Sequence, residues 1–238
     1  MRSLRQLLPF FCVIPLQVFG FQSLDSTLVS RGKVHVAPGE RYETSWLGSL
    51  FLGTHWRALW STAIEADVLD LEHSAGGLTP IKRGGTGRET KSLTFRGKDG
   101  KEYKFRSIDK DPKKLLPPEL QESIATDLLQ DQISSSNPLA PIVVAPLLNA
   151  VGVLNAEPRV VVLPDDKRLG EFRQDYGLLL GTFQEKPKGG TDDEPGFAGA
   201  DKTVRTFTLF RRLEENHNER EDAAEFLKAR LMDIYLGD

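Results

Sequence analysis

A glycine run, several basic strand residues and one helix acid are the residues of this chain that could do chemistry together. In chain order they are Gly84, Gly85, Gly87, Lys104, Arg106, Lys110 and Asp131. Glycine lets backbone amides approach phosphate oxygens closely, and a lysine or arginine on the next strand can hold those oxygens. An acid that pairs with this cation fixes its position. The order of these residues predicts a site for a nucleotide, with ATP and magnesium as the expected cofactors.

Within this set, Arg106 is the expected phosphate-holding cation. It shares a strand face with Lys104, whereas Lys110 lies just past the strand and is the reserve candidate. Asp131 is expected to pair with Arg106, because an unpaired carboxylate on an apolar helix face is costly. Arginine differs from lysine here, since its planar fork is not a compact point charge. The alternative is that these residues have a purely structural role: an ordinary turn, a solvated basic face and an internal Arg106–Asp131 ion pair.

The basic residues lie on a predicted β-hairpin. Residues 93–96 and 102–108 alternate apolar and polar side chains, and an Asp99-Gly100 turn joins them. Leu93, Phe95, Tyr103 and Phe105 then share one face. Because side chains alternate along a strand, Thr94, Arg96, Lys104 and Arg106 take the opposite face.

Asp131 lies on a helix predicted over residues 119–135. Leu120, Ile124 and Leu128 recur at the helical repeat and form its expected inner stripe. Asp131 falls near the middle of that stripe, which places the acid on the side that faces the protein.

Other segments complete the predicted elements. Short buried helices are expected over 42–70, with Trp46, Trp56 and Trp60 as core anchors. A helix over 139–151, a buried strand over 159–163 and a helical patch over 169–180 follow. Residues 186–201 are expected to form an exposed loop. An amphipathic helix is expected over 221–236, and four of its side chains are expected to face the interior: Ala223, Leu227, Leu231 and Ile234. The fold class is therefore α+β, with a small antiparallel sheet plus helices.

The first residues predict a cleavable secretory signal peptide. Arg2 and Arg5 precede an almost wholly apolar stretch over 7–19, and cleavage is expected after Gly20. The stretch is short for a membrane-spanning helix, which needs about 20 residues. The single cysteine, Cys12, leaves with this segment. An exported chain, periplasmic or outer-membrane-associated, without disulfides is therefore expected.

Composition limits the possible function classes. The chain has 31 Lys and Arg against 34 Asp and Glu, a net charge of −3, which argues against a nucleic-acid partner. The four histidines (His35, His55, His73 and His217) share no ligand spacing, so no metal site is predicted. No segment after the signal peptide is long and apolar enough to span a membrane.

The chain resembles a family of large bacterial exported proteins whose function is not characterised. The resemblance runs from about Tyr42 to the last residue. It is carried by Gly84-Gly85-Thr86-Gly87 through Leu93, Tyr103 through Pro112, Gln130 through Ser134, Glu157-Pro158-Arg159, Leu163 through Asp166, and Leu169 through Phe172. That family continues past a final Gly-Asp with Trp-Asp-Arg-His, similar to the catalytic loop of atypical kinases. Here Gly237 and Asp238 match only the first two positions, so the catalytic residues are unknown.

The resemblance implies a kinase-like nucleotide-binding domain, resembling the N-lobe and start of the C-lobe. The expected divisions are a signal peptide over 1–20, a flexible segment over 21–41, an N-lobe-like α+β region over 42–166, and a mainly helical, truncated portion over 167–238. On this reading the chain belongs to the cell envelope, with an outer-membrane barrel as a possible partner, and does not transfer phosphate. The alternative is a non-catalytic periplasmic interaction domain that precedes a barrel.

Overall fold

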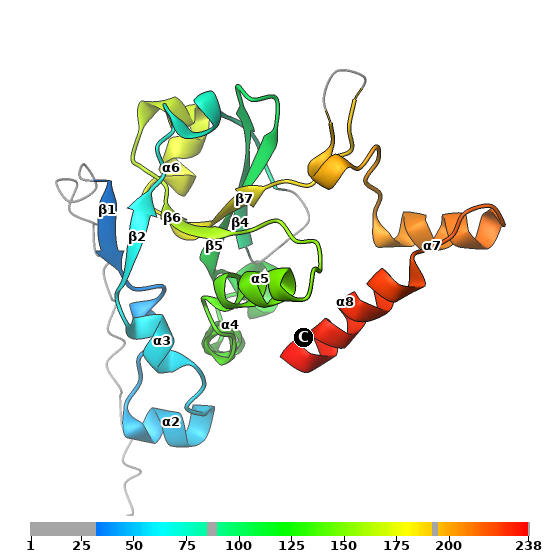
Figure 1. Cartoon of the computed structure of the whole chain (residues 1–238). Helices are drawn as coiled ribbons and strands as arrows, with labels where there is room; N and C mark the ends of the chain where they lie inside the picture. The colour runs from blue at the N-terminus through cyan, green and yellow to red at the C-terminus, as the bar shows by residue number, and fades with distance from the viewer. Residues whose placement is uncertain (1–31, 85–89, 192–194, 238) are drawn as a thin grey trace, which may run out of the picture.

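The computed structural model of the chain describes residues 32–84, 90–191 and 195–237. It is an α+β protein built on one mixed sheet of seven strands, in the order β1-β2-β6-β7-β5-β4-β3 (Figure 1). The strands are β1 Lys33–Val36, β2 Ile64–Val68, β3 Leu78–Arg83, β4 Thr90–Gly97, β5 Glu102–Lys110, β6 Arg159–Val162 and β7 Leu180–Glu185. The expected fold class is confirmed, but the sheet is larger than predicted. All neighbouring strands are antiparallel except β2 and β6.

The predicted hairpin is confirmed as β4 and β5. Leu93 pairs with Phe105, and Thr94 pairs with Lys104. The turn forms because Gly100 adopts a positive φ of 83° and Asp99 Oδ1 accepts a hydrogen bond of 3.1 Å from the amide of Lys101. The expected flexible segment contributes β1, and the expected C-terminal portion contributes β7, between β5 and β6.

The helices are shorter than the sequence predicts. They are α2 Trp46–Leu52, α3 Arg57–Ser61, α4 Ile124–Gln132, α5 Ala140–Ala150, α6 Arg173–Tyr176, α7 Thr206–Glu215 and α8 Ala223–Leu236. The 3-10 segments are η1 Glu40–Tyr42, η2 Ser74–Gly76, η3 Pro112–Leu115, η4 Pro118–Leu120, η5 Ile133–Ser135, η6 Lys167–Phe172 and η7 Phe197–Gly199. The helix expected over 119–135 is thus divided among η4, α4 and η5.

Two buried clusters lie on opposite faces of the sheet, because alternate residues of β6 and β7 point to opposite sides. Val161 and Phe183 join Leu93, Phe95 and Phe105 in the first cluster, which η6 and α6 cover. The second cluster lies on the other face, among β1, β2, β6 and the helices that pack there. Its buried members are Val34, Tyr42, Trp60, Ala66, Ile108, Ile133, Val162 and Leu180.

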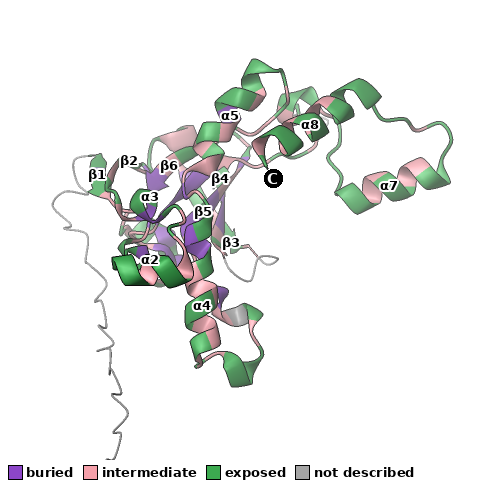
Figure 2. Ribbon diagram, turned by 90° about the horizontal axis from the view of Figure 1, so that it is seen from below, coloured by how far each residue is buried: buried purple, intermediate pink, exposed green. Residues whose placement is uncertain are grey.

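Several residues expected in the core are exposed. Trp60 is buried as predicted, whereas Trp46 is 74% exposed and Trp56 is 50% exposed. The expected inner stripes of α4 and α8 are also exposed at Ile124, Leu128, Leu227, Leu231 and Ile234. The helical repeat correctly identified these helices, but α2, α4, α7 and α8 turn much of their surface to solvent (Figure 2).

Candidate phosphate-binding face of the sheet

The sheet face that carries the second buried cluster changes from apolar to polar between β6 and β3. Near β6 it is apolar and covered, whereas on β7, β5 and β4 it presents hydroxyl, amide and basic side chains. Lys104 on β5 lies between Thr94 on β4 and Gln184 on β7. The adjacent row places Arg106 between Ser92 and Thr182. The sequence correctly predicted that Thr94, Lys104 and Arg106 share this face, here called the basic face.

Lys104 is the most constrained cation of the basic face. Its Nζ donates to Thr94 Oγ1 at 3.3 Å, and the side chain is half-buried. Burial lowers the pKa of Lys104 below its usual value, and the positive charges of Arg106, Lys186 and Lys82 lower it further. The negative charge of Glu102 raises the pKa of Lys104, but this effect is the smallest of those named. The protein therefore holds an ammonium group where the charged form is disfavoured.

Gly84 brings the start of the glycine run against this lysine. Its amide donates to the carbonyl of Ser92 at 2.7 Å, which ties the end of β3 to β4. A Cβ on Gly84 would lie 1.8 Å from Ser92 Oγ and 2.8 Å from Lys104 Nζ. The Gly84 backbone thus comes close to Lys104, and a side chain here would have to displace the flexible ends of Ser92 and Lys104. Gly85, Thr86 and Gly87 lie outside the described residues.

Negative charge near the basic face is concentrated on one buried carboxylate. Glu102 lies 2.5 Å from Lys186 Nζ and 3.2 Å from Arg96 Nη2. The hydrogen bond from Lys186 lowers the pKa of Glu102, against the opposing effect of burial. Within the described ranges, Lys82, Lys104 and Arg106 have no carboxylate within ion-pair distance. The basic face thus carries an excess of positive charge.

The structure places Asp131 away from Arg106, so the predicted Arg106–Asp131 pair is wrong. Asp131 binds Arg57 through two hydrogen bonds, Nη1 to Oδ1 at 2.7 Å and Nη2 to Oδ2 at 2.8 Å. Arg57 also donates to the carbonyls of Gly53 and Tyr42, and it is only 6% exposed. This bidentate pair joins α3 to α4. The expectation that Asp131 needs a cationic partner was correct, but the partner comes from the helices.

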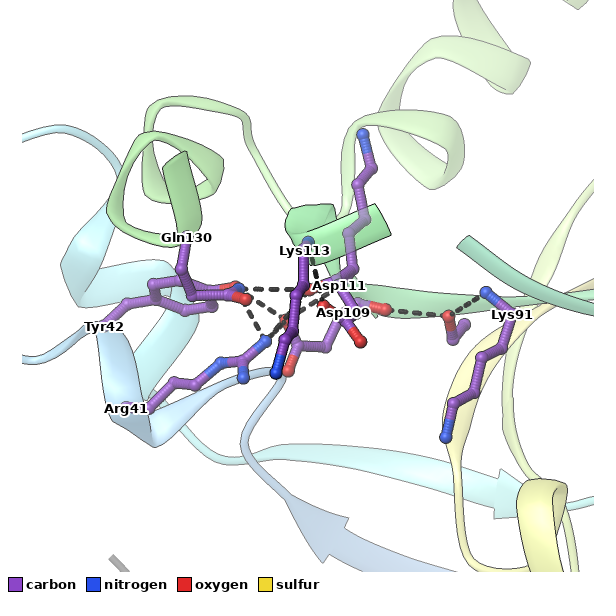
Figure 3. A network of polar contacts seen from close by, with 9 residues as sticks. Arg41, Tyr42, Lys91, Asp109, Asp111, Lys113 and Gln130 are labelled. Atoms are coloured by element: carbon purple, nitrogen blue, oxygen red, sulfur yellow. Dashed lines mark hydrogen bonds and ion pairs between the residues drawn. The ribbon is translucent and has the colours of Figure 1, made fainter. Parts of the chain in front are cut away.

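Lys110 belongs to a different polar network, which joins η1, the end of β5 and α4 (Figure 3). Its carbonyl accepts hydrogen bonds from Arg41 Nη2 and Gln130 Nε2, both at 3.0 Å. Tyr42 Oη donates to Asp109 Oδ1 at 2.7 Å. Burial and the adjacent Asp109 carboxylate raise the pKa of Tyr42. The network holds the elements together at the end of β5.

Sequence reasoning missed two cations that influence Lys104. Lys82 lies on β3, and Lys186 follows β7, neither of which was predicted as a strand. Thr182, also missed, faces the same side through its pairing with Arg106. These residues lie near Lys104 only because β7 is next to β5 and β3 is next to β4 in the sheet. This strand order was not apparent from the sequence.

The part of the chain that the structure describes contains no group of three or more His, Cys, Asp or Glu side chains arranged to hold a metal ion. None of its helices is long and apolar enough to cross a membrane. Comparison with models of known protein families, with curated proteins and with solved structures found no match.

Proposed function

We propose that this protein binds a nucleotide through its phosphate groups on the basic face of the sheet. The observation that carries the proposal is the position of Lys104, half-buried beside Gly84 and crowded by other cations. A phosphate placed there would supply negative charge and favour the charged form of the lysine. The partly exposed hydroxyl of Ser92 lies in the row of Arg106 and can donate to a phosphate oxygen, whereas the hydroxyls of Thr94 and Thr182 are buried beneath the basic side chains.

Of the likeness to a kinase N-lobe, this proposal keeps nucleotide binding but not catalysis. Gly84 beside a basic hairpin supports it, but the pair of strand cation and helix acid that kinases use is not formed, because Asp131 pairs with Arg57. Because Arg57 engages both oxygens of Asp131, we propose binding without phosphoryl transfer. ATP with magnesium is the proposed ligand, and the proposed location is the cell envelope after export.

Calorimetry of the purified chain with ATP, with and without magnesium, tests this proposal. Lys104→Gln should weaken binding about tenfold, the scale of one lost charge-assisted hydrogen bond. Lys113→Gln is the matched control, because Lys113 pairs with Glu122 away from the basic face. Equal affinity of both variants, or no heat of binding in the parent chain, would contradict the proposal. Inorganic tripolyphosphate should compete with ATP if the phosphates supply the recognition.

The pH dependence gives an independent readout at Lys104. Because its pKa is lowered in the folded chain, the folded state loses this proton before the unfolded state as pH rises. Stability of the free protein should therefore increase as pH rises through the folded pKa. ATP affinity should fall over the same range, since the neutral amine attracts phosphate less. An NMR titration of Lys104 Nζ that shows no upward pKa change with ATP would count against the site.

A non-catalytic interaction domain is the second candidate function, favoured by the exposed apolar side chains. Phe51 is 82% exposed on α2, and Phe207 is 88% exposed on α7. Large apolar side chains exposed on the surface of a protein are often found at binding sites. The outer-membrane barrel partner belongs to this candidate. Replacing Trp46 and Phe51 with serine should leave the melting temperature unchanged and reduce self-association or partner capture, if these residues serve binding.

A further inference from the structure

A concave site lies on the opposite side of the sheet from Lys104. It has a volume of about 410 Å³, within the usual range of about 300–1,000 Å³ for small-molecule sites. Six of the residues that line it carry the argument: Ser74, Tyr103, Glu157, Arg159, Phe183 and Glu185. Tyr103 and Phe183 share the face of the first buried cluster, so this pocket is separate from the basic face.

Two stacked aromatic rings form an apolar wall of the pocket. The Tyr103 and Phe183 ring centroids are 5.3 Å apart, and the ring planes differ by 6°. Phe183 is buried among core residues, whereas Tyr103 is partly exposed. A hydrogen bond from the Tyr103 hydroxyl to Asp99 Oδ2 fixes this ring. A flat apolar group can therefore pack against the exposed part of Tyr103 without rearrangement of the core.

The charged groups of the pocket are not all neutralised by one another. Glu185 pairs with Lys101 at 2.8 Å. Glu157 instead accepts a hydrogen bond from the neutral amide of Asn149 at 2.7 Å. The Arg159 guanidinium lies 5.3 Å from the Phe183 ring centroid, and no carboxylate of the described segments is within ion-pair distance of it. The pocket thus presents one positive and one negative group that are not paired with each other, although only one residue separates them in sequence.

We propose that this pocket binds a free aromatic α-amino acid as its zwitterion. The ligand ring packs against the exposed part of Tyr103, which itself stacks on Phe183; the ligand carboxylate meets Arg159, and its ammonium meets Glu157. A ligand with one charge would leave either Arg159 or Glu157 without a counter-charge, so a zwitterion suits the pocket best. This site is independent of the nucleotide proposal, because it shares no charged residue with the basic face.

Three probes that share a phenyl ring and differ in charge test this inference. Phenylalanine, phenylacetate and 2-phenylethylamine would each be titrated into the full chain, with NMR shifts of the Tyr103 and Phe183 rings as the readout. Phenylalanine should bind at least about tenfold more tightly than either singly charged probe. Arg159→Gln should reduce phenylalanine affinity to that of the amine, and Glu157→Gln should reduce it to that of phenylacetate.

The control is Arg211→Gln, which removes an arginine charge from the exposed surface of α7. It should leave all three affinities unchanged. Both pocket charges are exposed, so their variants should fold, and dispersed amide resonances would verify this. The inference is overturned if phenylacetate binds as tightly as phenylalanine, if Arg159→Gln has no effect in the folded chain, or if no probe shifts the two rings.

Discussion

At the residue scale, the Arg57–Asp131 pair and Lys104 are stabilised in opposite ways. Arg57 and Asp131 are largely removed from water, but each charge has its counter-charge in bidentate geometry. Lys104 is half-buried with a hydroxyl partner and other cations nearby. The charges of Arg57 and Asp131 neutralise each other within the protein. The charge of Lys104 is not neutralised there and would be stabilised by a bound anion. This contrast separates a structural ion pair from a candidate binding site.

Asp131→Ala should therefore lower the free energy of unfolding by about 3–5 kcal/mol, because it leaves the Arg57 guanidinium buried without its counter-charge. The removal of both partners should cost less than the sum of the single changes. Urea unfolding of Arg57→Ala, Asp131→Ala and the double variant measures this coupling. Arg106→Ala, which removes an exposed cation, should change stability by less than about 0.5 kcal/mol. Additive effects of the two single changes would contradict the pairing.

At the element scale, Gly181 on β7 leaves room for its neighbours on β5. A Cβ added to Gly181 would lie 2.3 Å from Phe105 Cζ and 2.4 Å from the carbonyl oxygen of Arg106. The carbonyl oxygen is part of the backbone and cannot rotate away as a flexible side chain can. Only glycine therefore permits this spacing in the middle of the sheet.

Gly181→Ala should destabilise the protein by about 1–3 kcal/mol or more, because the two strands must separate to accept the methyl group. Gln184→Ala on the same strand is the control, since its side chain is partly exposed; it should shift stability by less than about 0.5 kcal/mol. Thermal unfolding followed by circular dichroism measures both changes. A melting temperature of Gly181→Ala equal to that of the parent would show that the strands have room to spare.

The elements that sequence reasoning predicted are those specified by local signals. The alternation of residues 93–108 and the Asp99-Gly100 turn specify β4 and β5. β3 was missed because Pro80 and Lys82 disrupt its alternation, and β7 because Gly181 interrupts a short apolar run. The partner of Asp131 lies 74 residues earlier in the chain, at a separation that no local pattern reports.

At the scale of the whole molecule, the apolar side chains are unevenly covered. The sheet has buried clusters on both faces, whereas α2 and α7 lie away from it and carry exposed aromatic residues (Figure 1). Helical periodicity predicts that a helix has an apolar side, but it does not identify what covers that side. This explains why sequence reasoning placed Trp46 and Leu231 in the core.

The predicted export of the chain can be checked from the N-terminus of the mature protein. Residues 1–20 lie outside the described part, so the signal peptide remains a prediction from sequence. Mass spectrometry of the protein from a secreting host should find an N-terminus at Phe21, because Gly20 ends the expected cleavage motif. The replacement of three apolar residues in the 7–19 stretch with glutamate should retain the chain in the cytoplasm. Recovery of the unaltered chain with Met1 intact in the cytoplasm would contradict export.

The central place of β7 also governs the order in which the molecule can fold. β4 and β5 are joined by a tight turn, so they can pair as soon as both have been synthesised. β7 is the last described strand in the sequence, yet it separates β5 from β6. Until residues 180–185 arrive, the β3-β4-β5 ribbon and β6 each expose an unpaired strand edge, which is a template for aggregation. A chain during synthesis therefore exposes these edges until nearly four-fifths of it has emerged, with Glu185 of 238 residues closing the sheet.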